Sequence, residues 1–253
     1  MAIAQITPAP VHRDPELLGQ TVVVIGGSSG IGLATARRAH DEGAHVVLVA
    51  RDPRRLCEAT RDLERGTRRP LDANDPSALR RFFETSPRPI DHVMVTAGGP
   101  HYGPLLEKDA AQVRSALSER VALTVEVAHS ALGNVRPGGT LLFMSSTDGR
   151  RISRDNGIES AATAALPAVI ADLALELAPV RVNLIAAGFV DTPLSASILG
   201  EGLDARRDEL RATLPIGRVV EPEDVAALAV HLMANSAITG ATYDIDGGQQ
   251  FLS

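Results

Sequence analysis

Short continuous apolar runs alternate with amphipathic stretches along most of the chain. Apolar runs that are bounded by turn residues are typical of parallel strands buried on both faces. Strands are predicted at Val22–Ile25, His45–Ala50, Arg69–Leu71, Ile90–Thr96, Gly139–Ser145, Val180–Ile185 and Ala241–Ile245. Helices are predicted near Leu33–His40, Pro53–Glu64, Pro76–Glu84, Leu105–Leu132 and Ser160–Ala178. This alternation predicts a single-domain α/β fold, a doubly wound parallel sheet with helices on both faces.

Two segments depart from the alternation. The first 17 residues hold three prolines by position 15, which predicts an extended N-terminal arm before one domain at 18–253. Between Ala186 and Leu214 the chain holds Gly188, Pro193 and Gly200 directly after a predicted strand. Long irregular loops are uncommon in compact domains unless they are functional, so this segment is predicted to be a mobile substrate lid. The alternative is an ordinary surface excursion.

Composition argues against several kinds of partner. The formal charge is −6 over 253 residues, so no basic surface favours nucleic acid. Cys57 is the one cysteine, which prevents an internal disulfide and fits a reducing cytoplasm. The N-terminal stretch holds no long apolar run, so neither a signal peptide nor a membrane span is expected. The seven histidines show no metal-ligand spacing, and no metal is expected.

A glycine-rich turn follows the first predicted strand. Gly26, Gly30 and Gly32 give the spacing G-x-x-x-G-x-G between an apolar run and an amphipathic stretch. Glycines permit a tight turn and close backbone approach, and the start of a helix offers unpaired N–H groups to an anion. The turn therefore predicts a phosphate-binding site.

This turn and several later motifs resemble the short-chain dehydrogenase/reductase family. The later motifs are Ala97-Gly98, Ser145-Ser146, RVN at 181–183, AGFVDTP at 187–193, GRVVEPEDVA at 217–226 and ITGATYDIDGG at 238–248. The resemblance runs from about Leu18 to the end of the chain and implies a Rossmann-type fold. It also implies hydride transfer between a nicotinamide cofactor and a small carbonyl or alcohol, in a homodimer or homotetramer. The cofactor-binding residues that it implies are Gly26, Ser28, Ser29, Gly30, Ile31, Arg51, Asp72, Ala97, Gly98, Gly99, Gly188, Val190 and Thr192.

The end of the second predicted strand indicates which cofactor is preferred. Family members that prefer NAD carry an acid there, which hydrogen-bonds the ribose hydroxyls and repels a phosphate. Here Arg51 follows Ala50, and a guanidinium suits the 2′-phosphate of NADP(H). Arg54 and Arg55 are interpreted rather as a solvated helix start. Asp72 matches the family's aspartate near the adenine, although by itself it could equally be a helix cap.

The proton relay of the family is largely replaced in this chain. In the family a serine orients the carbonyl, and a tyrosine thirteen residues later transfers the proton. A lysine four residues beyond lowers the pKa of that tyrosine, and a helical asparagine upstream holds a water. Ser146 matches the serine, but Glu159 stands at the tyrosine position and Thr163 at the lysine position. The asparagine position aligns with Arg120.

Glu159 does not replace a tyrosine directly. An ordinary glutamic acid has a pKa of about 4.3, so it is ionised at neutral pH and donates no proton. Burial favours the neutral form, whereas an adjacent arginine favours the ionised form. We therefore predict a Glu159–Arg120 ion pair where the relay would stand; the alternative is that both side chains face water. Thr163 can offer one hydroxyl, and Pro167 is expected to reshape the helix that carries these positions.

A substitute acid is predicted in the loop after the fourth strand. Tyr102 and His101 follow Gly98-Gly99, in a region that lines the substrate pocket of the family. The alternative is a loop tyrosine that packs on the lid. The predicted catalytic residues are Ser146, Glu159, Thr163, Arg120 and Tyr102.

Three functions remain open from the sequence. The first is an NADP(H)-dependent oxidoreductase of small carbonyls or alcohols with a non-standard proton donor. The second is a non-catalytic member that senses nucleotide or stabilises a partner. The third is a non-redox enzyme that uses Glu159 as a base. The retained glycine turn and Arg51 favour the first.

Overall fold

The computed structural model of the protein describes residues 15–86, 89–150 and 156–252. The predicted N-terminal arm lies outside these residues apart from 15–17. The strands are β1 Thr21–Ile25, β2 His45–Ala50, β3 Gly66–Pro70, β4 Ile90–Val95, β5 Val135–Ser146, β6 Arg181–Ala187 and β7 Thr242–Ile245. The helices are α1 Gly30–Asp41, α2 Pro53–Ala59, α3 Pro76–Thr85, α4 Ala110–Ala131, α5 Gly157–Glu176, α6 Pro193–Leu199, α7 Leu203–Thr213 and α8 Pro222–Ala234. Short 3-10 turns lie at Leu105–Glu107, Thr147–Arg150, Gly200–Gly202 and Gln249–Phe251.

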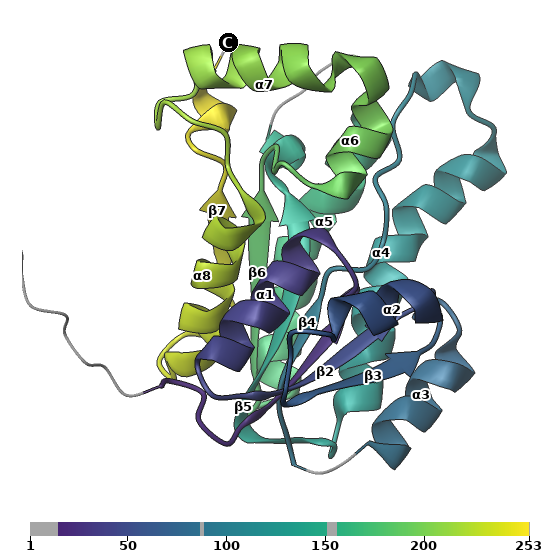
Figure 1. Ribbon diagram of the computed structural model, residues 1–253. Coiled ribbons are helices and arrows are strands. Elements are labelled where there is room, and N and C mark those ends of the chain that lie inside the picture. Colours follow the sequence, from purple (N-terminus) through teal and green to yellow (C-terminus); the bar gives the residue numbers. More distant parts are fainter. Residues whose placement is uncertain (1–14, 87–88, 151–155, 253) are drawn as a thin grey trace, which may run out of the picture.

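The seven strands form one parallel sheet in the order β3-β2-β1-β4-β5-β6-β7. The chain moves outward from β1 to β3 and then returns to place β4 beside β1, so the topological switch point lies between β1 and β4. In open sheets of this kind, ligands bind outside the carboxyl ends of the strands at the switch point. In Figure 1, α6 and α7 extend beyond the end of the sheet where β6 stops. The predicted fold class is confirmed.

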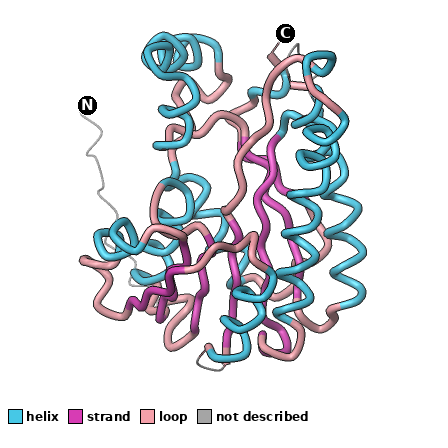
Figure 2. The backbone as a smooth tube through the Cα atoms, turned by 90° about the vertical axis from the view of Figure 1, so that its right-hand side faces the viewer, coloured by secondary structure: helices cyan, strands magenta, loops and turns pink. Residues whose placement is uncertain are grey.

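Helices cover both faces of the sheet, and alternate residues of each strand face opposite layers. Val23 of β1 packs in a core with side chains of α3, α4 and α5, whereas Val22 and Val24 pack with α1, α2 and α8. Figure 2 shows the strands with helices to either side of them. The continuous apolar runs in the sequence follow from this two-sided burial.

Local signals set where several helices begin. Asp52 and Asp75 accept hydrogen bonds from backbone N–H groups in the first turns of α2 and α3, and a proline follows each of them. Asp109 and Gln112 form a capping box at the start of α4. A side-chain oxygen at the N-cap satisfies donors that have no partner within the helix, and proline suits the first helical position.

The segment expected to be an irregular lid is largely helical. It contains α6 and α7, joined by a short 3-10 turn, and β6 extends two residues further than predicted, to Ala187. Thr192 begins α6 because its hydroxyl oxygen accepts a hydrogen bond from the N–H of Ser195 at 3.1 Å. The sequence analysis also missed α8, which packs against the sheet beside α1.

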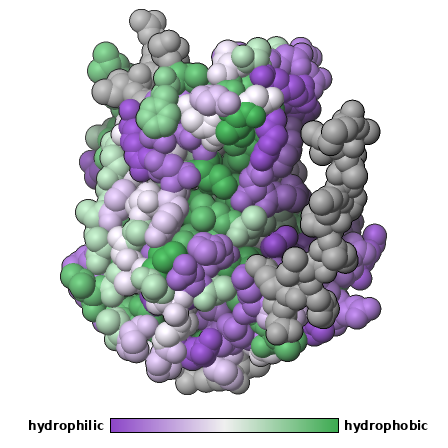
Figure 3. Space-filling model, turned by 90° about the vertical axis from the view of Figure 1, so that its left-hand side faces the viewer, coloured by the Kyte–Doolittle hydropathy of each residue, from purple (hydrophilic) through white to green (hydrophobic). Residues whose placement is uncertain are grey.

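The helix α5 continues through Pro167 as one element, so the proline does not end the helix. Its residues Leu166, Ile170 and Leu173 are buried against the sheet. By length and composition alone α5 could cross a membrane, but helices in the cores of soluble proteins meet the same criterion. On the face shown in Figure 3, green apolar areas are broken up by purple hydrophilic residues.

Candidate functional site

Two cavities adjoin at the carboxyl ends of the central strands. The first, of about 620 Å³, lies beside the glycine turn and the ends of β1, β2 and β4. The second, of about 480 Å³, lies beside the end of β5, the start of α5 and α6. Five residues line both cavities: Ile31, Gly98, Met144, Thr192 and Leu194. The two cavities therefore share part of their walls.

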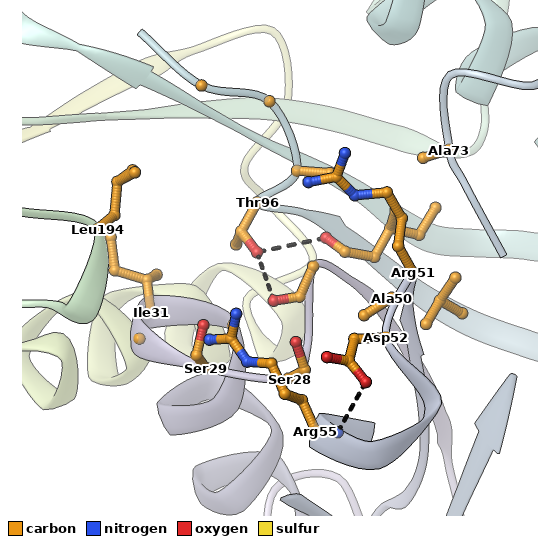
Figure 4. Close-up of a pocket in the computed structure, with 18 of the residues that line it drawn as sticks. Ser28, Ser29, Ile31, Ala50, Arg51, Asp52, Arg55, Ala73, Thr96 and Leu194 are labelled. Atoms are coloured by element: carbon orange, nitrogen blue, oxygen red, sulfur yellow. Dashed lines mark hydrogen bonds between the residues drawn. The ribbon is translucent and has the colours of Figure 1, made fainter. Parts of the chain in front are cut away.

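Steric contacts explain the glycines in the turn. Gly26 has a φ of +96°, and a Cβ there would lie 2.4 Å from the hydroxyl oxygen of Thr96. A Cβ on Gly32 would meet the carbonyl oxygen of Gly26 at 2.4 Å. The Thr96 hydroxyl lies 3.3 Å and 3.2 Å from the carbonyl oxygens of Ile25 and Gly26, as the dashed lines in Figure 4 show. Thr96 thus fixes the turn from the neighbouring strand β4.

The start of α1 offers donors to the first cavity. Ser29 is the N-cap, but its side chain makes no capping hydrogen bond, and both Ser28 and Ser29 line the cavity. The first backbone N–H groups of a helix have no partner within it and carry partial positive charge. Two hydroxyls and several N–H groups therefore converge where a phosphate would bind.

Of the three arginines that follow β2, two line the first cavity. Arg51 and Arg55 both line the first cavity, and Figure 4 shows both guanidinium groups turned inward among the lining residues. Arg55 is exposed in the first turn of α2, as the interpretation of a solvated helix start expects, and it also lines the cavity. Asp52 also lines the cavity, but its carboxylate accepts hydrogen bonds from the N–H groups of Arg54 and Arg55 at 2.8 and 3.3 Å.

Asp72 lines the far part of the first cavity. Its carboxylate accepts a hydrogen bond from the N–H of Asn74 at 3.0 Å, and Asp75 rather than Asp72 caps the following helix. The alternative role of Asp72 as a helix cap is therefore wrong. The predicted cofactor residues that line this cavity are Gly26, Ser28, Ser29, Gly30, Ile31, Arg51, Asp72, Ala97, Gly98, Gly99 and Thr192. Gly188 and Val190 line the second cavity instead.

The residues of the first cavity fit a dinucleotide. A Cβ on Gly98 or Gly99 would meet no atom within 4 Å, so a side chain at either position would project into open space of the cavity. The hydroxyls, N–H groups and guanidinium groups described above suit phosphate oxygens. The volume lies within the range of natural ligand pockets.

Four of the five predicted catalytic residues meet in the second cavity: Ser146, Tyr102, Glu159 and Arg120. The Oγ of Ser146 accepts a hydrogen bond from the N–H of Asp148 at 3.0 Å, which leaves the serine proton to be donated. Tyr102 is 45% exposed. Its partial burial, followed by the nearby carboxylates of Asp148 and Glu159, raises the pKa of Tyr102 to about 12. The phenol is therefore protonated at neutral pH and can donate a hydrogen bond.

The predicted ion pair between Glu159 and Arg120 is present. Arg120 Nη2 donates to Glu159 Oε1 at 2.7 Å, and the N–H of His101 donates to Glu159 Oε2 at 3.0 Å. Glu159 is 1% exposed. Each of its two carboxylate oxygens accepts a hydrogen bond, one from α4 and one from the loop after β4. The alternative that both side chains face water is wrong. The Nε of Arg120 is buried and has no hydrogen-bond partner in the part of the chain that the structure describes.

Two residues considered for catalysis do not line the second cavity. Thr163 is buried, and its hydroxyl hydrogen-bonds the backbone carbonyls of Glu159 at 2.8 Å and Ser160 at 3.2 Å. The expectation that it offers a hydroxyl to a ligand is wrong, because a threonine inside a helix satisfies the preceding turn. The ring of His101 instead contacts Glu119, with 2.7 Å between Nε2 and Oε2.

Several lining residues were missed by the sequence analysis. Asp148, Asn156, Arg206 and Gln249 bring polar groups to the second cavity, and Phe189 brings an aromatic ring. Asp148 could have been found, because it lies two residues after Ser146 at the same strand end. Arg206 and Gln249 are far from the motifs along the chain and reach the cavity only through folding.

Comparison with known proteins gives a consistent result. A family model described as enoyl-(acyl carrier protein) reductase matches residues 25–250. The chain is 30% identical to the short-chain dehydrogenase/reductase ATR9 of Stachybotrys chlorohalonatus, with 92% of this chain and 98% of that protein covered. It is 28% identical to carbonyl reductase family member 4 of Danio rerio, with 93% and 100% covered.

Solved structures share the fold. A small-chain dehydrogenase in complex with NADPH superimposes with a TM-score of 0.80 at 28% sequence identity. The match covers 92% of this chain and all of that chain, 100%. The NADPH in that structure was observed bound to that protein.

Proposed function

Because the chain belongs to the short-chain dehydrogenase/reductase family, we propose that it is an NADP(H)-dependent oxidoreductase of a small carbonyl compound or the corresponding alcohol. One observation carries the proposal. The cavity at the glycine turn opens directly into a second cavity that holds Ser146 and Tyr102. The NADPH complex of one relative and the carbonyl reductase name of another support the choice of cofactor and substrate.

The first cavity supplies the groups that would hold the cofactor. Ser28, Ser29 and the N–H groups at the start of α1 would bind the pyrophosphate, and Arg51 with Arg55 would bind the 2′-phosphate. Bound NADPH supplies a hydride to a carbonyl carbon. The acid next to the arginines, Asp52, is engaged in capping α2, which lessens its competition for the ribose.

We infer that the relay of the family is altered here. At the tyrosine and lysine positions, Glu159 is held by two donors and Thr163 is turned into its own helix. Neither supplies a proton to the substrate. The third function considered, a non-redox enzyme with Glu159 as base, is disfavoured because both carboxylate oxygens accept hydrogen bonds within the protein.

The remaining groups of the second cavity can take over these tasks. Ser146 would donate to the carbonyl oxygen and orient it, and the buried, unpartnered Nε of Arg120 would donate to the same oxygen as negative charge develops. Tyr102 would then transfer its phenolic proton to that oxygen and regain one from water through its exposed side. Glu159 acts as a positioning residue that holds Arg120.

The assembly and compartment are proposed from weaker signals. The family resemblance supports a homodimer or homotetramer. The single cysteine supports the cytoplasm, and the net charge of −6 argues against a nucleic acid partner.

Calorimetric titration with NADPH and NADH tests the proposal most directly. We expect NADPH to bind in preference to NADH, and Arg51→Ala to weaken NADPH binding more than NADH binding. A screen of small ketones and aldehydes with NADPH then tests for turnover. Failure of both nucleotides to bind would contradict the proposal. Tight binding without turnover of any carbonyl would favour the non-catalytic, nucleotide-sensing alternative.

A further inference from the structure

Four charged side chains line the second cavity, and one of them lacks a counterion among the residues that the structure describes. Arg120 pairs with Glu159 at 2.7 Å, and Arg206 pairs with Glu209 at 2.7 Å. The carboxylate of Asp148 takes part in no ion pair and no side-chain hydrogen bond within the described ranges 15–86, 89–150 and 156–252. Among the described lining residues, the charge without a partner is therefore negative.

A second polar group of the cavity also lacks a partner. Asn156 is 8% exposed, and its buried Oδ1 accepts no hydrogen bond from any residue that the structure describes. Although Asn156 occupies the N-cap position of α5, its side chain makes no capping hydrogen bond. A buried polar atom without a partner is costly unless a ligand or water satisfies it. Asp148 and Asn156 thus present two hydrogen-bond acceptors to the same cavity.

Backbone hydrogen bonds hold Asp148 close to Ser146, the residue proposed to orient the substrate carbonyl. The N–H of Asp148 donates to Ser146 Oγ at 3.0 Å, and the carbonyl oxygen of Asp148 accepts from Ser160 Oγ at 2.9 Å. The negative charge is also felt across the cavity, because the Asp148 carboxylate is one of the causes that raise the pKa of Tyr102. Much of the remaining lining is apolar: Ile31, Pro100, Met144, Phe189, Val190, Leu194, Ile198 and Leu199.

We propose that the substrate carries a protonated amine near its carbonyl or hydroxyl group, with Asp148 as the counterion and Asn156 Oδ1 as a second acceptor. An ammonium group supplies several donors and one positive charge, which matches two acceptors and one negative charge. The apolar lining suits the hydrocarbon frame that joins the two groups. The inference rests on the proposed oxidoreductase function and names its substrate class as an amino ketone or amino alcohol.

The test compares two ketones of similar shape and different charge, 4-piperidone, whose protonated secondary amine has two N–H donors, and cyclohexanone. NADPH-dependent reduction of each is measured with the wild-type protein, Asp148→Asn and Asn156→Ala. Binding of the corresponding alcohols, 4-hydroxypiperidine and cyclohexanol, is measured by calorimetry with and without NADPH. Asp62→Asn is the matched control, because this carboxylate is 78% exposed and lies outside both cavities.

We expect the wild type to prefer the amine about 10- to 100-fold in kcat/KM and in alcohol affinity, as for a charged hydrogen bond. Asp148→Asn should abolish this preference while NADPH affinity stays unchanged, which also shows that the variant is folded. Asn156→Ala should reduce the preference, and Asp62→Asn should leave it intact. Equal affinity for the two alcohols, or a preference that survives Asp148→Asn, would overturn the inference. If the wild-type protein did not bind NADPH, the proposed function would be contradicted. The alcohol titration without NADPH would still decide between a charged and a neutral ligand.

Discussion

Arg120 and Glu159 join α4 to α5 across the wall of the second cavity, with 2.7 Å between Nη2 and Oε1. The Arg120 side chain is 16% exposed and the Glu159 side chain 1%. Glu159 also accepts the N–H of His101, so one carboxylate holds a helix and the loop after β4 together. In this position the pair joins elements of the cavity wall, and Arg120 Nε is buried without a hydrogen-bond partner among the described residues.

A double-mutant cycle tests how strongly this pair is coupled. Replacement of one member of a buried ion pair leaves the other charge unpaired, so Glu159→Gln or Arg120→Met should each lower the free energy of unfolding by about 3–5 kcal/mol. The double variant should lose less than the sum of the two. Urea denaturation of the four proteins measures the coupling energy. Strictly additive losses would mean that the two side chains act independently.

Arg51 and Arg55 should contribute to NADPH affinity, whereas Arg54 should not. Arg51→Ala and Arg55→Ala should each weaken NADPH binding about 10- to 100-fold, because each removes a charged hydrogen bond to the 2′-phosphate. NADH lacks that phosphate, so its affinity should change little. Arg54→Ala is the matched control, since Arg54 lies on the same helix but outside the cavity lining. A loss of NADPH affinity in Arg54→Ala equal to that in Arg51→Ala would contradict the assignment.

Removal of the Tyr102 hydroxyl should slow reduction. If Tyr102 is the general acid, Tyr102→Phe should lower kcat about 10²- to 10⁴-fold with little change in NADPH affinity. Because the pKa of Tyr102 is raised to about 12, its protonated form persists, and its contribution should not decline between pH 6 and about pH 11. Steady-state kinetics across this range provide the measurement.

Tyr243→Phe is the control for Tyr102→Phe. Tyr243 is the other tyrosine of the chain, lies in β7, and packs partly buried against a hydrophobic core. Its variant should keep the wild-type rate. An unchanged rate in Tyr102→Phe would remove this residue from the mechanism.

His92 should make the fold sensitive to acid. Burial and then the nearby Arg181 and Arg136 lower the pKa of His92 from 6.5 to about 3. Its Nε2 lies 2.6 Å from Gln20 Oε1, and its buried Nδ1 has no partner among the described residues, which offer no acceptor for a second proton there. Between these two pKa values the unfolded chain binds one more proton than the folded chain, so stability falls as the pH is lowered.

The contribution of His92 to the pH dependence of the unfolding free energy can be measured by comparing the wild type with a His92 variant. Each pH unit below 6.5 costs about 1.4 kcal/mol of unfolding free energy, so His92 contributes a loss of about 2 kcal/mol between pH 7 and pH 5. His92→Gln should remove that part of the pH dependence. Urea denaturation of both proteins at the two pH values gives the comparison. Parallel loss in wild type and variant would show that His92 does not remain neutral in the folded state.

Local patterns in the sequence determined the fold class and most of the cofactor side. The strand at 45–50 and the start of α2 at Pro53 were predicted correctly, because a continuous apolar run and an Asp-Pro helix start are local signals. The glycine turn was equally clear, because close backbone contacts such as that between Gly32 and Gly26 admit no side chain. Eleven of the cofactor residues that the family resemblance implies line one cavity.

The tertiary structure decided what the substrate side can do. Whether Glu159 is a free base or a bound anion depends on Arg120 and His101, which lie 39 and 58 positions away along the chain. Thr163 was predicted to offer a hydroxyl to the site, but in the helix this hydroxyl donates to the backbone carbonyl of Glu159. The lack of a charged partner for Asp148 among the described residues is likewise a property of the folded chain. Charge compensation and hydrogen-bond satisfaction are long-range, whereas strand, turn and cap signals are short-range, and this difference separates what the sequence determines from what only folding decides.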